Sequence, residues 1–145
     1  MKRIVVKFLF ILLLSCSNDT SNRNPFLQEF GFRFDLNLNL PLYSPLTNTG
    51  NAVFIGNQGV GIRGVFVMNV GFNQFRAFEA TDPNHAPNSC STMDLNGQTA
   101  VCPCEQYEYS LFTGQMLNRP DDGQRRFDML EYRTRFSGNV VSVSN

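Results

Sequence analysis

The chain has 145 residues, 42% of them hydrophobic, with 12 basic and 12 acidic side chains, which is enough for one domain with its own core. Three of the basic residues, Lys2, Arg3 and Lys7, precede an apolar run, and the chain after that run has no lysine and nine basic against 12 acidic side chains. This mildly acidic balance gives no support for nucleic-acid binding.

The first residues are typical of a targeting signal. The apolar run Phe8–Leu14 follows the basic residues and is far shorter than the roughly 20 residues that cross a bilayer. The sequence Leu13-Leu14-Ser15-Cys16 resembles the lipobox of bacterial lipoproteins, in which the chain is cut before a lipidated cysteine. We expect residues 1–15 to be a lipoprotein signal peptide. The alternative is an ordinary signal peptide with an incidental cysteine.

The lipoprotein resemblance implies a location in the bacterial cell envelope, facing the periplasm or the outside. Cys16 would carry acyl chains that hold the protein on a membrane. The polar residues that follow contain no apolar periodicity. We therefore expect residues 16–28 to be the lipidated cysteine and a tether, and residues 29–145 to form the domain.

The predicted domain is all-β. Short apolar or alternating runs bounded by Gly, Asn and Pro predict about nine strands in a small antiparallel sandwich or barrel. No stretch of ten residues or more has helical periodicity. The eight clearest of these runs, in chain order, are 32–40, 52–55, 64–70, 75–80, 98–102, 107–112, 129–136 and 140–143.

Three apparent motifs do not fit their context. Gly59 to Gly64 matches the dinucleotide-binding pattern G-x-G-x-x-G, but a strand follows where that motif needs a helix. The segment 120–123, Pro-Asp-Asp-Gly, lacks the ligand spacing of a calcium loop and predicts a type I turn. The arginines of the last hairpin are expected on its solvent face, and they are residues 125, 126, 133 and 135.

The residues that could carry chemistry gather in one segment. The single histidine, His85, and the three cysteines after Cys16 lie within twenty residues of one another. Disulfides are common in exported proteins, and Cys102 and Cys104 are too close in sequence to bond each other across one proline. Cys90 would therefore pair with either Cys102 or Cys104, which leaves one thiol free.

The same segment resembles the two cluster-binding loops of Rieske iron–sulfur proteins. That family carries C-x-H-x-x-C in one loop and C-P-C-H-G in the other, and two cysteines and two histidines bind the irons. Here the loops are Asp-Pro-Asn-His at 82–85 and Cys-Pro-Cys-Glu at 102–105. The resemblance covers about residues 50–145. It implies a Rieske-like fold, His85 and Cys102 as ligands, and a disulfide between Cys90 and Cys104.

The departures from the family pattern concern the ligands. Asp82 stands where the first ligand cysteine belongs, and Glu105 stands where the second histidine belongs. The small pair that usually follows is Gln106-Tyr107. Iron–sulfur clusters select thiolates, whereas carboxylates suit harder cations. We therefore expect no standard [2Fe–2S] cluster.

Three hypotheses follow. The first is a scaffold without a cofactor, with the two loops joined by a disulfide and acting in binding or structure. The second is an electron carrier whose [2Fe–2S] cluster has unusual ligands, or a set of His85 and all three cysteines with no disulfide. The third is a single zinc or iron ion held by His85, Cys102, Asp82 and Glu105. No catalytic residue is predicted, because a Cys102–His85 nucleophile has no identifiable third group. The sequence names no protein partner.

Overall fold

The computed structural model describes residues 23–145, so the expected signal peptide, Cys16 and most of the tether lie outside the described residues. This part of the chain contains nine strands, one short 3-10 helix (Ser44–Thr47) and no α-helix, which confirms the all-β prediction. None of its helices is long and apolar enough to cross a membrane. The strands are β1 (Arg33–Asn37), β2 (Ala52–Ile55), β3 (Val65–Gly71), β4 (Gln74–Glu79), β5 (Asp94–Asn96), β6 (Thr99–Val101), β7 (Glu108–Ser110), β8 (Glu131–Ser137) and β9 (Val140–Ser144).

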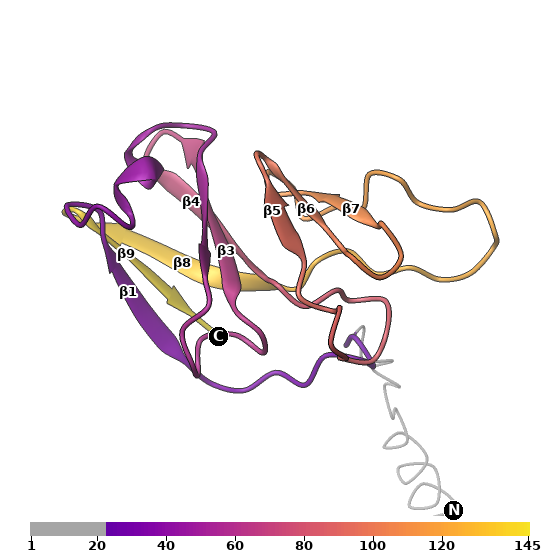
Figure 1. Cartoon of the computed structure of the whole chain (residues 1–145). Helices are drawn as coiled ribbons and strands as arrows, with labels where there is room; N and C mark the ends of the chain where they lie inside the picture. The colour runs from indigo at the N-terminus through magenta and orange to yellow at the C-terminus, as the bar shows by residue number, and fades with distance from the viewer. Residues whose placement is uncertain (1–22) are drawn as a thin grey trace, which may run out of the picture.

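The strands form two antiparallel sheets, which lie side by side in Figure 1. The larger has six strands in the order β1-β9-β8-β4-β3-β2, and the smaller has three in the order β5-β6-β7. Strand β8 changes partner along its length. Its first two residues, Glu131 and Tyr132, pair with β4, and Arg133–Ser137 pair with β9. This change of partner lets the larger sheet curl around its own core.

Strands β3 and β4 separate two hydrophobic clusters. Because side chains alternate along a strand, Val65 and Val67 face the cluster inside the larger sheet, and Phe66 and Met68 face the cluster shared with the smaller sheet. All four side chains are at most 1% exposed. Burial on both faces explains why β3 is a continuous apolar run rather than an alternating one.

The glycine-rich segment before β3 is a turn, as the sequence indicated. Gly64 has a φ of 117°, a conformation that favours glycine. The buried carboxylate of Glu79 accepts hydrogen bonds from the backbone N–H groups of Ile62 (2.7 Å) and Arg63 (3.0 Å). No helix follows these glycines, so the segment lacks the feature that a dinucleotide site requires.

Two predicted strands differ in extent from the observed ones. The run 32–40 ends as a strand at Asn37, because the chain then turns and Leu40 donates its N–H to the Asn37 carbonyl. The run 107–112 contributes only Glu108–Ser110. Strand β5 was not predicted, since its three residues are all exposed and show no alternation.

The packed part of the chain begins before the expected boundary at residue 29. Asn24 donates a side-chain hydrogen bond to the Pro83 carbonyl (2.7 Å), and Leu27 is 3% exposed. Phe26 also contacts the Phe127 ring edge to face. Residues 24–27, which the sequence assigned to the tether, therefore dock on the domain beside the loop that carries His85.

Candidate metal centre

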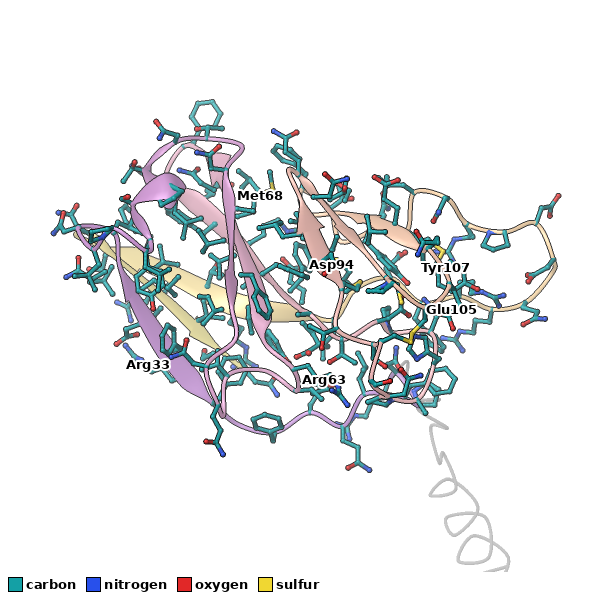
Figure 2. The ribbon with its side chains drawn as sticks, in the orientation of Figure 1. Arg33, Arg63, Met68, Asp94, Glu105 and Tyr107 are labelled. Carbon is teal, nitrogen blue, oxygen red and sulfur yellow. A yellow bond between two sulfur atoms is a disulfide. The ribbon has the colours of Figure 1, made fainter. Side chains whose placement is uncertain are left out.

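Two loops at one end of the molecule carry the candidate residues. The first loop, residues 80–93, joins β4 to β5, and the second, residues 102–107, joins β6 to β7. A disulfide between Cys90 and Cys104 links the two loops, with 5.5 Å between the Cα atoms. Figure 2 shows sulfur atoms gathered near the labelled Glu105 and Tyr107. The structure thus contains the disulfide that the Rieske resemblance implied.

The second loop is a tight turn that closes on Cys102. The Cys102 N–H donates to the Tyr107 carbonyl (2.8 Å), and the Gln106 N–H donates to the Cys102 carbonyl (2.9 Å). Gln106 has a φ of 60°, a conformation that glycine adopts more readily. This residue stands where the Rieske pattern has a glycine. The backbone therefore keeps the turn although the side chain has changed.

The first loop is held by a buried polar network around Asp82. One carboxylate oxygen of Asp82 accepts the Asn84 N–H (2.7 Å), and the other accepts the Tyr109 hydroxyl (3.0 Å). The Asn84 side chain in turn donates to the Phe127 carbonyl and accepts the Phe127 N–H. Asp82 is 0% exposed. The network fixes the first loop against β7 and the segment before β8.

Three donor atoms of different chemistry converge between the loops. The Cys102 Sγ lies 3.6 Å from the His85 Nε2 and 3.4 Å from the Glu105 Oε2. The His85 Nε2 lies 3.2 Å from the same Glu105 oxygen. The Cys104 Sγ belongs to the same group, in which all four donor atoms lie within 4.8 Å of one another. This group is the candidate metal centre.

Hydrogen bonds orient the His85 ring with its Nε2 toward the centre. The other ring nitrogen, Nδ1, lies 3.1 Å from the Ala86 carbonyl and 3.4 Å from the Ser91 hydroxyl. The Ala86 carbonyl at Nδ1 and the Glu105 carboxylate at Nε2 can both only accept, so a cation at the centre would take the place of a hydrogen on Nε2. Metal-binding histidines are oriented in this way by the partner of their second nitrogen.

The Cys102 thiol is fully buried and is not an activated nucleophile. Burial raises its pKa to about 12, and the charge of Asp82 acts in the same direction. The backbone N–H groups of Glu105 and Cys104 donate toward the sulfur and oppose this rise. The thiol is therefore protonated at neutral pH in the metal-free protein, and a bound cation would displace the proton.

The three distances match one face of a tetrahedron around a single ion. Bond lengths of about 2.3 Å to sulfur and about 2.0–2.1 Å to nitrogen or oxygen give tetrahedral edges of about 3.3–3.6 Å. The observed edges among Cys102, His85 and Glu105 are 3.2–3.6 Å. The group can therefore hold one ion with little rearrangement, with a fourth position left for water or another ligand.

The same residues do not fit a [2Fe–2S] cluster, which the Rieske fold would imply. Such a cluster takes four protein ligands, two on each iron. Asp82, the expected fourth ligand, has both carboxylate oxygens engaged by Asn84 and Tyr109, and it lies outside the candidate group. The three remaining donors touch one another instead of spanning two irons. The structure therefore does not bring Asp82 together with His85, Cys102 and Glu105.

The arrangement also differs from a catalytic triad. In a triad, the nucleophile and the orienting carboxylate bind opposite nitrogens of the histidine ring. Here Cys102 and Glu105 both approach the same atom, Nε2 of His85. Together with the raised pKa of Cys102, this geometry is that of a ligand set and not of an acid–base relay.

Sequence reasoning missed two supporting residues. Tyr109 is 0% exposed and hydrogen-bonds Asp82, and Asn84 connects Tyr109 with the Phe127 backbone. The alternation of the run 107–112 contained a signal for Tyr109, since Tyr109 and Leu111 share a face and are both buried. The role of Asn84 depends on a contact 43 residues away in sequence, for which the sequence holds no local signal.

Comparisons with known proteins find similarity to solved structures only. No protein-family model matches the chain, and no curated protein matches it. The cyanobacterial plasma membrane Rieske protein from Synechocystis PCC 6803 is 27% identical, over 64% of this chain and 85% of that one, with a TM-score of 0.48.

Two further similar structures are ferredoxins or contain one. A chain in the complex of reduced oxygenase and oxidized ferredoxin of carbazole 1,9a-dioxygenase is 19% identical, over 81% of this chain and 94% of that one, with a TM-score of 0.48. The ferredoxin of Sphingomonas yanoikuyae B1 is 14% identical, over 68% of this chain and 88% of that one, with a TM-score of 0.45. Rieske and ferredoxin chains are thus among the solved structures to which this chain is similar.

Proposed function

We propose that this protein is a lipid-anchored component of the bacterial cell envelope whose domain binds one metal ion, of the zinc class, in place of a [2Fe–2S] cluster. Cys102, His85 and Glu105 would hold the ion, and the fourth position would take water or an external ligand. The observation that carries the proposal is the set of three donor distances, 3.2–3.6 Å, which fits a single tetrahedral ion.

The chemistry of the donors supports zinc over a hard or a very soft cation. One thiolate, one imidazole and one carboxylate form a mixed set that zinc accepts in proteins. Magnesium and calcium prefer oxygen ligands alone, and copper(I) prefers sulfur. Ferrous iron is the closest competitor for such a set. Three protein ligands and one open position are typical of zinc sites that bind an exchangeable ligand.

The protein surroundings prepare the site for an ion. The Ala86 carbonyl fixes the His85 ring, and two backbone N–H groups point at the Cys102 sulfur. The Cys90–Cys104 disulfide connects the loop that carries His85 to the loop that carries Cys102 and Glu105. Such preorganisation reduces the conformational cost of bringing the donors together.

The membrane location rests on the lipobox-like sequence at residues 13–16. Asn24 is bonded to Pro83, so the chain joins the domain beside the first loop. An extended chain reaches at most about 3.6 Å per residue, so a lipid on Cys16 would keep Asn24 and this end of the domain within about 29 Å of the bilayer surface. The loop end of the domain would then lie near the membrane. Incorporation of labelled palmitate into the wild type but not into Cys16→Ala tests the anchor.

Metal analysis of the protein purified without air tests the site. We expect no acid-labile sulfide, and one equivalent of zinc after titration of the oxidised protein. His85→Ala and Glu105→Ala should each weaken zinc binding by about tenfold or more. Asp121→Ala, which removes an exposed carboxylate that is not part of the group of donor atoms, is the matched control and should bind like the wild type.

Two other results would each overturn the proposal. Two irons and two sulfides per chain would indicate an electron carrier of the Rieske type. A colourless protein that binds no transition metal, with one titratable thiol after unfolding, would indicate a scaffold without a cofactor.

A further inference from the structure

We propose that Cys104 is a latent fourth ligand of the candidate metal centre, withheld by its disulfide with Cys90 and released when that bond is reduced. The inference rests on the proposed function, because it concerns the same ion. It assigns the disulfide a role in controlling the metal site in addition to its role in linking the loops.

The position of the Cys104 sulfur supports this role. It lies within 4.8 Å of the donor atoms of Cys102, His85 and Glu105, and the Cys90 sulfur is not part of that group. Two thiolates on one tetrahedral zinc lie about 3.8 Å apart, and the separation between the Cys104 and Cys102 sulfurs exceeds this by at most about 1 Å. A change in the χ1 angle of Cys104 can supply a movement of this size once the bond to Cys90 is broken.

Access to the bond is also favourable. Cys90 and Cys104 are both only partly buried, whereas Cys102 is 0% exposed. A dithiol reductant can therefore approach the disulfide from solvent without opening the core. The buried Cys102 remains a ligand of the candidate metal centre whether the Cys90–Cys104 disulfide is oxidised or reduced.

The reaction balances with an external dithiol as reductant. One thiolate of the reductant attacks a sulfur of the Cys90–Cys104 bond, and its second thiol resolves the mixed disulfide. Two electrons pass to the protein, the reductant becomes a disulfide, and Cys90 and Cys104 become thiols. When Cys104 then binds the ion, its proton passes to solvent.

The two redox states would differ in coordination. In the oxidised protein the ion has three protein ligands and one open position. In the reduced protein it has four, Cys102, Cys104, His85 and Glu105, which is a closed site. Reduction would therefore raise the metal affinity and exclude any external ligand from the ion.

Two variants separate this effect from the loss of the disulfide itself. Cys90→Ala and Cys104→Ala break the same bond, but only Cys90→Ala leaves a thiol at the position that faces the ion. We expect Cys90→Ala to bind zinc roughly tenfold or more tightly than Cys104→Ala. Cobalt(II) bound to Cys90→Ala should also show a sulfur-to-metal absorption about twice as strong. Equal affinities and equal spectra would overturn the inference.

A second measurement uses the wild type and does not depend on the variants folding. The cobalt-loaded protein is compared before and after treatment with a phosphine reductant, which cleaves disulfides. A gain in sulfur-to-metal absorption supports the latent ligand, and an unchanged spectrum overturns it. Zinc binding by the oxidised wild type reports separately on the proposed function. A protein that binds zinc when oxidised but shows no gain on reduction would keep the proposed function and lose this inference.

Discussion

The two sheets of this domain are stabilised by different means. The six-stranded sheet surrounds a large hydrophobic cluster that includes Leu36, Leu46 and Val141, all 0% exposed. The three-stranded sheet has strands of only three residues and carries loops that are joined by a disulfide and by the hydrogen bonds of Asp82. The first is a scaffold whose stability comes from apolar burial. The second is a short platform that packs on the cluster it shares with β3 and β4 and is further held by these few specific bonds, and the candidate centre lies on it.

A cavity in the larger sheet should have the largest effect on stability. Leu36→Ala removes a side chain that is 0% exposed, and we expect the free energy of unfolding to fall by about 3 kcal/mol. Urea denaturation measures the change. Because Leu36 is remote from the loops, zinc stoichiometry of the folded variant should stay at one. A loss below about 1 kcal/mol would contradict the role given to this core.

Breaking the disulfide should have a comparable effect, but in the other sheet. For a sequence separation of 14 residues, the chain-entropy model gives about 3 kcal/mol. We expect Cys90→Ala, measured without metal, to melt at a lower temperature. Hydrogen exchange should increase in residues 80–93 and 102–107 and change little in the strands of the larger sheet. An unchanged melting temperature would show that the loops do not need this bond.

Asp82 should contribute to the stability of the fold, whereas Glu105 should contribute to zinc binding. Asp82→Ala leaves the Tyr109 hydroxyl and the Asn84 N–H without their acceptor, so we expect a loss of about 2 kcal/mol in the free energy of unfolding. Zinc binding should persist. Glu105→Ala should weaken zinc binding and change the free energy of unfolding little, since this side chain is 39% exposed and offers a donor to the ion. If Asp82→Ala abolished zinc binding in a folded protein, Asp82 would have to be reinstated as a ligand.

The smallest expected effect is at the turn between β3 and β4. Phe72 is 98% exposed and has a φ of 53°, a strained conformation for an aromatic residue. Phe72→Asn places a residue that tolerates this conformation, and we expect a stabilisation of about 0.5–1 kcal/mol. Thermal melting measures it, with zinc affinity as the control that should not move. A lower melting temperature would mean that the Phe72 side chain makes a favourable contact.

The sequence predicted the scaffold better than the platform. Alternation located β8 and β9, and apolar runs located β2, β3 and β4, of which β3 is buried on both faces. The exposed strand β5 and the buried role of Asp82 were not predicted. Asp82 was expected at the ion because it occupies a ligand position of the family pattern. Tyr109 and Asn84, brought close by the fold, engage its oxygens instead.

The cysteines were more predictable than the carboxylates. Family spacing implied the Cys90–Cys104 bond and left Cys102 free, and the structure has both features. The contact between Glu105 and His85 depends on how the two loops meet, which spacing within one loop does not determine. The family pattern thus implied the disulfide between the loops, whereas the contacts of the substituted carboxylates emerge only with the fold.

X-ray absorption at the zinc edge of the oxidised, zinc-loaded protein reports directly which atoms surround the ion. We expect one sulfur neighbour at about 2.3 Å and nitrogen or oxygen neighbours at about 2.0–2.1 Å, with one imidazole among them. A zinc ion surrounded by oxygen atoms alone would contradict the account, because the ion would then lie away from Cys102 and His85.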